Sequence, residues 1–223
     1  MLKLIYLARR KPGLDFDQFV RRWRQHGALG MQQPFWRQAL CYVQAEPILP
    51  TPIAGASEDF DAVAYFMLRD ATFDEMTGED NIGSALMAAD ELETFSAPIP
   101  STSLWVDEET IKAGERGGIT AFLFFEDAST AATAAAWVRD ATGLERVILN
   151  RTSEAMAAMN TLPFATVLEV SAPNLSLLSA ALQANDRQLL ATSELTVVTR
   201  EAVLWDRLAT ASPKAQDNPG LYY

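Results

Sequence analysis

Short apolar runs alternate along the chain with longer segments in which apolar residues recur at helical spacing. Residues 2–8 form a nearly continuous apolar run, which is typical of a strand buried on both faces. Residues 14–30 place their large apolar side chains on one face if each residue turns by about 100°, which predicts an amphipathic helix. Asp15 can cap this helix, and Gln18 three residues later completes a capping-box pattern.

The first half of the chain reads as β-α-β-β-α-β. After the opening strand and helix, Pro34 breaks any helical continuation. The remaining elements of this half are predicted as strands at 36–45, 60–68 and 101–106 and a helix at 74–92. Residues 111–118 end a charged, glycine-containing stretch and are predicted to be a linker.

The same order of elements recurs in the second half. Strands are predicted at 119–125, 146–150, 165–170 and 195–205, and helices at 129–141 and 175–190. Two local matches support an internal duplication: Trp23-x-x-His26 is echoed by Trp137-x-x-Asp140, and the last strand of each half ends in Leu-Trp.

These patterns predict an α+β fold made of two ferredoxin-like βαββαβ repeats in one chain, packed by their sheets. Residues 1–110 would form the first repeat, with a candidate pocket. Residues 119–208 would form a second, degenerate repeat, and residues 209–223 a tail.

Composition and net charge limit the classes of function that the chain can have. The 223 residues carry 18 Lys and Arg against 29 Asp and Glu, a net charge of −11, so binding to a phosphate backbone is not expected. The single cysteine, Cys41, cannot form an intrachain disulfide. No signal-peptide pattern and no apolar run of about 20 residues is present, so a cytoplasmic protein without a membrane span is expected.

Several motifs in the first half together resemble the EthD-domain family. The resemblance covers residues 1–109 and rests on Lys3-Leu-Ile-Tyr-Leu7, Arg10-Lys-Pro-Gly-Leu14, Phe19-x-x-x-Trp23, Phe60-Asp-Ala-Val-Ala64 and Ala89-Asp-Glu-x-x-x-Phe95. It implies a dimeric α+β barrel that holds small hydrophobic molecules between sheet and helices. Members and relatives include cofactor-free oxygenases, and dehydratases and cyclases of aromatic polyketides.

The chain departs from the family pattern at one position. The family usually has a histidine four residues after the tryptophan, where this chain has Gly27, and His26 stands one position earlier. A shift of one position rotates the side chain by about 100° around the helix.

His26 and Asp61 are the candidate catalytic residues. A histidine with a pKa near its usual value of about 6.5 suits proton transfer at neutral pH. The alternative for His26 is a favourable interaction with the dipole at the helix end. Asp61 opens an otherwise apolar strand, where a carboxylate needs a partner or water. It would orient His26 or a substrate hydroxyl, or else cap the strand in solvent.

The candidate substrate-binding residues are aromatic: Tyr6, Trp23, Trp36 and Tyr65. They would line an apolar pocket, with ordinary core packing as the alternative. The chain has no Ser-His-Asp order, Walker loop, dinucleotide fingerprint or zinc-ligand spacing, so no cofactor or metal is expected.

These features together favour a cofactor-independent enzyme that acts on a hydrophobic, oxygenated small molecule. An aromatic substrate is expected. Its chemistry would be that of an acid/base lyase, dehydratase, isomerase or cyclase. Two alternatives stay open: a cofactor-free oxygenase of an aromatic substrate, and a non-catalytic small-molecule-binding or accessory protein. A homodimer is compatible with the sequence but not required by it.

Overall fold

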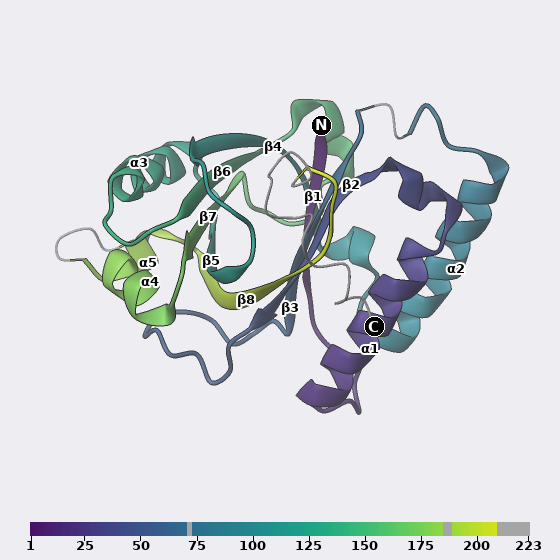
Figure 1. Ribbon diagram of the computed structural model, residues 1–223, viewed down its shortest axis with the longest axis horizontal. Helices are drawn as coiled ribbons and strands as arrows, with labels where there is room; N and C mark the ends of the chain where they lie inside the picture. The colour runs from purple at the N-terminus through teal and green to yellow at the C-terminus, as the bar shows by residue number, and fades with distance from the viewer. Residues whose placement is uncertain (71–72, 185–188, 209–223) are drawn as a thin grey trace, which may run out of the picture.

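A closed antiparallel barrel forms the centre of the computed structural model, which describes residues 1–70, 73–184 and 189–208. Figure 1 shows α1 and α2 on one side of the barrel and α3, α4 and α5 on the other. The strands are β1 (Leu2–Ala8), β2 (Ala39–Pro47), β3 (Ala62–Leu68), β4 (Ser103–Lys112), β5 (Gly118–Phe125), β6 (Arg146–Thr152), β7 (Thr166–Ala172) and β8 (Leu195–Asp206). The α-helices are α1 (Phe16–Met31), α2 (Gly78–Thr94), α3 (Ala128–Arg139), α4 (Leu175–Leu182) and α5 (Leu189–Thr192), and the 3₁₀-helices are η1 (Pro34–Gln38), η2 (Ile99–Thr102) and η3 (Glu154–Met159).

The two halves of the chain contribute four adjacent strands each. Around the barrel the strands follow the order β1-β3-β2-β8-β5-β7-β6-β4, so the first half reads β4-β1-β3-β2 and the second half β8-β5-β7-β6. Antiparallel pairing of β2 with β8 and of β4 with β6 joins the two sets. The barrel therefore leaves no open sheet edge between the two halves.

Both faces of β1, β2, β3, β5 and β7 are buried over most of their length, as their apolar sequences predict. On β1, Ile5 and Leu7 belong to the core inside the barrel, whereas Tyr6 and Ala8 belong to a core outside it. A third core packs the opposite outer face of the barrel against α3 and α4. Alternation along each strand thus separates one inner core from two outer ones.

Part of the barrel interior is occupied by paired charges. Lys3 and Arg146 each place a side-chain nitrogen 2.6 Å from a carboxylate oxygen of Glu169, and all three side chains are buried. Burial opposes ionisation of Glu169, but the two cations outweigh it and lower the pKa of its carboxyl to about 2. Because one partner comes from β1 and the others from β6 and β7, the network ties the two halves together.

The capping box predicted for α1 is confirmed: Asp15 accepts from Gln18 N–H and the Gln18 side chain accepts from Asp15 N–H. Other predicted boundaries were wrong. Trp36 lies in η1 rather than in a strand, because Pro34 starts a 3₁₀ turn there. The helix expected from residue 74 begins only at Gly78, after the Thr77 cap.

The helix expected at 175–190 is two segments, α4 and α5. Strand β4 runs on to Lys112, into the predicted linker. The predicted tail at 209–223 lies outside the described residues.

Candidate functional site

Two adjoining cavities lie under α1 and α2, against the outer face of the first-half strands. We call the larger one, of about 240 Å³, the apolar lobe. The other, of about 220 Å³, is the histidine lobe. The two lobes share four lining residues: Leu4, Phe35, Trp36 and Phe66.

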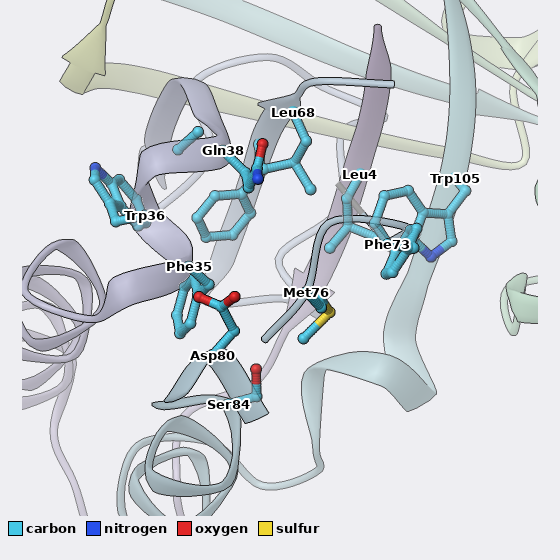
Figure 2. A pocket seen from close by; sticks show the side chains of 12 residues that line it. Leu4, Phe35, Trp36, Gln38, Leu68, Phe73, Met76, Asp80, Ser84 and Trp105 are labelled. Atoms are coloured by element: carbon cyan, nitrogen blue, oxygen red, sulfur yellow. The ribbon is translucent and has the colours of Figure 1, made fainter. Parts of the chain in front are cut away.

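Aromatic and aliphatic side chains make most of the wall of the apolar lobe. Figure 2 shows Leu4, Phe35, Phe73 and Met76 around it, with the carboxylate of Asp80 at the α2 side. That carboxylate is not free, because it accepts hydrogen bonds from Arg37 and from the Thr77 backbone N–H. The apolar lobe therefore offers a ligand a largely hydrophobic surface.

The histidine lobe contains His26 from α1 and Glu91 from α2. His26 is only 4% exposed, and its Nδ1 lies 2.7 Å from Oδ2 of Asp90. The other Asp90 oxygen accepts from Arg22. Phe95 packs edge-on against the imidazole, with ring centroids 5.3 Å apart. The hydrogen bond to Asp90 of α2 and the contact with Phe95 thus hold the imidazole ring of His26 in one orientation.

These contacts determine the protonation state of His26. Burial lowers the pKa of the imidazole below its usual value of 6.5, although the hydrogen bond and charge of Asp90 act in the opposite direction. Burial also opposes ionisation of Asp90, but hydrogen bonds from Arg22 and His26 outweigh it and lower the pKa of that carboxyl. An ionised carboxylate can only accept, so Nδ1 carries the hydrogen and Nε2 carries a lone pair.

The Nε2 atom of His26 makes no hydrogen bond with the part of the chain that the structure describes. A neutral imidazole with its Nδ1–H bound to a carboxylate and its Nε2 unbonded has the arrangement of a general base.

Gly27 allows α1 to approach the barrel closely. A Cβ atom there would lie 2.9 Å from Nε2 of Gln44 and 3.0 Å from Cε1 of Tyr42. A histidine at this position, as in the EthD pattern, would not fit without moving these side chains. The lone histidine stands instead at position 26, where Asp90 is within reach.

Of the aromatic residues predicted to bind substrate, Trp36 lines both lobes. Tyr6 and Trp23 are fully buried behind the cavities, where the Trp23 Nε1–H donates to the Tyr6 hydroxyl at 2.9 Å. Tyr65 lies in the barrel interior, with its ring centroid 4.6 Å from Nζ of Lys3. The structure brings His26 and Trp36 to the same cavity and places the other three elsewhere.

Asp61 immediately precedes β3, and its carboxylate accepts from the Arg10 backbone N–H at 2.8 Å and pairs with the Arg10 side chain. The carboxylate that contacts His26 is that of Asp90. Asp90 and Glu91 belong to the motif Ala89-Asp-Glu-x-x-x-Phe95 in a predicted helix, but sequence reasoning gave neither of them a role. The signal in the sequence was two adjacent acids in an otherwise apolar helical turn, which does not reveal their partners.

No group of three or more potential metal ligands occurs in the ranges that the structure covers. Within the same ranges, every helix is too short or too polar to cross a bilayer.

Comparison with known proteins identifies the fold. No protein-family model and no curated protein matches the sequence. A solved structure described as an anthrone oxidase-like protein superposes with a TM-score of 0.55, at 10% identity over 93% of this chain and 94% of that one. A variant of the chlorite dismutase from Candidatus Nitrospira defluvii superposes with a TM-score of 0.51, at 9% identity over 90% and 91%. These neighbours belong to the dimeric α+β barrel superfamily, and this chain has its fold.

Proposed function

We propose that this protein is a cofactor-independent enzyme that transfers protons on a hydrophobic, oxygenated aromatic small molecule. The observation that carries the proposal is His26, which lines an aromatic cavity with its Nδ1 on Asp90, while no described residue is hydrogen-bonded to its Nε2. The reaction class would be an acid/base elimination, isomerisation or ring closure.

The apolar lobe would bind the body of the ligand. Its aromatic wall, with Trp36 at the junction of the two lobes, suits a flat ring system. Tyr6 and Trp23 would support this wall from behind rather than contact the ligand. Asp61 and Tyr65 would act only on the fold, through Arg10 and the barrel interior.

In this proposal Nε2 of His26 removes a proton from a carbon next to a substrate carbonyl. The adjacent carbonyl activates this proton by delocalising the negative charge that develops, and the negative charge of Asp90 stabilises the imidazolium that forms. Arg22 keeps Asp90 ionised throughout.

We also infer that the two halves are copies of one ferredoxin-like βαββαβ unit, and that the first copy is of the EthD type. The matching strand orders β4-β1-β3-β2 and β8-β5-β7-β6 support a duplication. The motifs at residues 3–7, 10–14 and 60–64 support the EthD assignment.

The test is base-catalysed exchange of a carbon-bound proton in 1-tetralone, a bicyclic aromatic ketone. We expect the wild-type protein to accelerate hydrogen–deuterium exchange at the carbon beside the carbonyl, measured by NMR in D₂O. The variant His26→Asn keeps an amide that can donate to Asp90 but has no titratable nitrogen. It should lose about 100-fold or more of the exchange rate, the usual contribution of a general base.

The matched control is Gln25→Asn, a change at the exposed neighbouring position. It should exchange 1-tetralone at the wild-type rate. Binding of 1-naphthol to His26→Asn, followed by fluorescence, should stay within a few fold of the wild type. Unchanged exchange in His26→Asn would remove the basis of the proposal, and 1-naphthol binding with no exchange in the wild type would instead favour a non-catalytic binding protein.

A cofactor-free oxygenase is the second candidate. The same base in a buried apolar cavity would produce a substrate carbanion that reduces dioxygen, and one neighbour in fold is described as anthrone oxidase-like. Oxygen consumption by the wild-type protein with anthrone, lost in His26→Asn, would favour this reaction over elimination.

A further inference from the structure

Two consecutive acids on α2, Asp90 and Glu91, lie in opposite environments. Successive residues of a helix point about 100° apart. Asp90 therefore faces α1, where it binds Arg22 and His26. Glu91 lines the histidine lobe, in the same cavity as His26. One acid supports the base from behind, and the other faces the space that a ligand would fill.

Glu91 is held in place by one of its two oxygens. Its Oε2 accepts from the Ile99 backbone N–H at 3.0 Å, at the start of η2. No described residue donates a hydrogen bond to Oε1. Apart from Glu91, the titratable side chains that line this lobe are His26 and Tyr42, and the Tyr42 hydroxyl is bound by Gln44.

The environment of Glu91 raises the pKa of its carboxyl. Burial raises the pKa of this carboxyl above its usual value of 4.5, and the neighbouring charge of Asp90 adds to the rise, although the Ile99 N–H opposes it. The two shifts act toward the forms that the two roles need, a neutral imidazole for a base and an acid form for a proton donor.

We propose that Glu91 is the proton donor that works opposite His26, and that the pair removes water from a β-hydroxy ketone with an apolar ring body. This inference rests on the proposed function of His26 as a base. Nε2 of His26 takes the proton from the carbon between the carbonyl and the carbinol. The C–O bond of the carbinol breaks, a C=C bond forms, and Oε1 of Glu91 gives its proton to the leaving oxygen, which departs as water.

The step balances within the site. His26 ends as imidazolium and Glu91 as carboxylate, and transfer of one proton between them restores both groups. No oxidant or reductant is consumed. A proton donor for a leaving hydroxyl is needed for elimination but not for oxygenation, so Glu91 favours the first candidate reaction over the second.

The experiment uses 3-hydroxy-1-tetralone, which loses water to give the fluorescent product 1-naphthol. The test variant is Glu91→Gln, whose amide oxygen can still accept from Ile99 N–H. The control is Glu93→Gln, two residues along the same helix, where the side chain is 68% exposed. We expect Glu91→Gln to lower kcat by about 100-fold or more with little change in KM, and Glu93→Gln to match the wild type.

A pH profile separates a proton donor from a residue that only anchors η2. The wild-type rate should fall as pH rises through the pKa of Glu91, and this limb should be missing in Glu91→Gln. A merely structural Glu91 would change the unfolding temperature without changing the shape of the profile.

The outcomes distinguish the two proposals. If His26→Asn abolishes exchange of 1-tetralone but Glu91→Gln eliminates water within threefold of the wild-type rate, the base is supported and the acid assignment is overturned. If the wild type exchanges 1-tetralone but forms no 1-naphthol, the acid assignment is also overturned. If His26→Asn exchanges and eliminates at wild-type rates, both proposals fail.

Discussion

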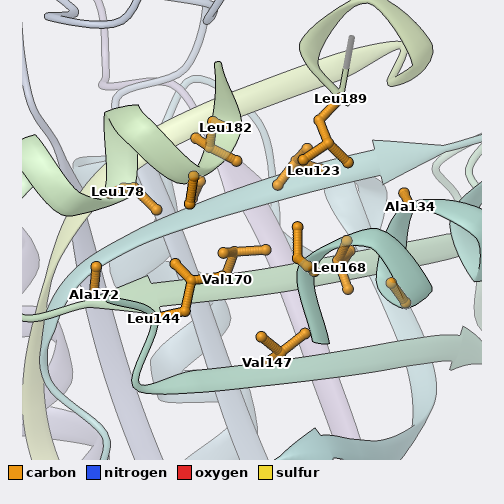
Figure 3. Packing of buried hydrophobic residues seen from close by; sticks show 14 of the residues in the cluster. Leu123, Ala134, Leu144, Val147, Leu168, Val170, Ala172, Leu178, Leu182 and Leu189 are labelled. Atoms are coloured by element: carbon orange, nitrogen blue, oxygen red, sulfur yellow. The ribbon is translucent and has the colours of Figure 1, made fainter. Parts of the chain in front are cut away.

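The two outer helical layers of the barrel are built from different kinds of side chain. In the second half, α3 lies against the sheet through small residues, Ala131, Ala134 and Ala135, all of them buried. Figure 3 shows Leu178 and Leu182 of α4 over Leu123, Leu168 and Val170 of the sheet. In the first half, rigid aromatic rings occupy the equivalent space, and both lobes lie among them.

The difference shows how one architecture can yield a filled layer or a hollow one. Branched aliphatic side chains and alanine interdigitate, so a helix can pack closely on the sheet. Planar rings such as Trp36 and Phe66 meet edge to face, with centroids 6.0 Å apart, and both rings line the two lobes. The hollow layer also carries His26 and Glu91, whereas the layer in the second half is built on a large cluster of buried hydrophobic residues.

Leu178→Ala should give the largest loss of stability. Leu178 is fully buried in the filled layer, so truncation leaves a cavity and should cost about 2–5 kcal/mol of unfolding free energy. Met87→Ala in the hollow layer should cost clearly less, because Met87 is only partly buried and already borders a cavity. Urea denaturation of both variants measures the comparison, and equal losses would mean that the two layers are packed alike.

Much of the fold could be predicted from the sequence because its signals are local. Apolar runs mark the strands, and Asp15 and Gln18 are close enough in sequence for their capping box to be recognised. The pairing of β2 with β8 and of β4 with β6 could not be predicted, because it joins segments that are far apart in the chain. The sequence indicated how the helices pack on the barrel only in part, through the alanine-rich segment that forms α3.

The candidate site was predicted less completely, and for the same reason. His26 is conspicuous as the only histidine, but its partner Asp90 is 64 residues away. Tyr6, Trp23 and Tyr65 are aromatic residues in apolar segments, as Trp36 is. Only the face of the strand or helix on which each side chain lies decides whether it lines a cavity or belongs to a core. The direction of a side chain in an element that is buried on both faces is not encoded by hydrophobicity.

Gly27→Ala should destabilise the protein by about 1–3 kcal/mol, because the new methyl group would overpack against Gln44 and Tyr42. Gly30→Ala, one turn later in α1, is the matched control. There the nearest atom is Cε of Met87 at 3.3 Å, the end of a flexible side chain that can move away. Gly30→Ala should therefore be neutral or stabilising by up to about 1 kcal/mol, as expected for glycine to alanine in a helix.

Thermal and urea unfolding of the two glycine variants would show the difference directly. Because Gly30 lines the histidine lobe, its alanine variant should also bind 1-naphthol more weakly despite its stability. Equal destabilisation by both substitutions would mean that α1 is as tightly packed over the cavity as it is over Gln44, which would contradict a hollow layer.

The smallest effect is a pH dependence confined to the hollow layer. Burial lowers the pKa of His26 in the folded protein, so the unfolded chain takes up this proton more readily as pH falls below about 6.5. The wild type should therefore lose stability from pH 6.5 downward until His26 titrates in the folded state, and the pairing with Asp90 keeps this loss small.

The difference in unfolding free energy between the wild type and His26→Asn should shrink over that range. Glu91 is present in both proteins, so its contribution cancels. The difference between the wild type and Leu178→Ala should change less with pH, because Leu178 packs within a cluster of buried hydrophobic residues. A gap between the wild type and His26→Asn that widens on acidification would instead mean that Asp90 holds His26 as an imidazolium, which cannot act as the base.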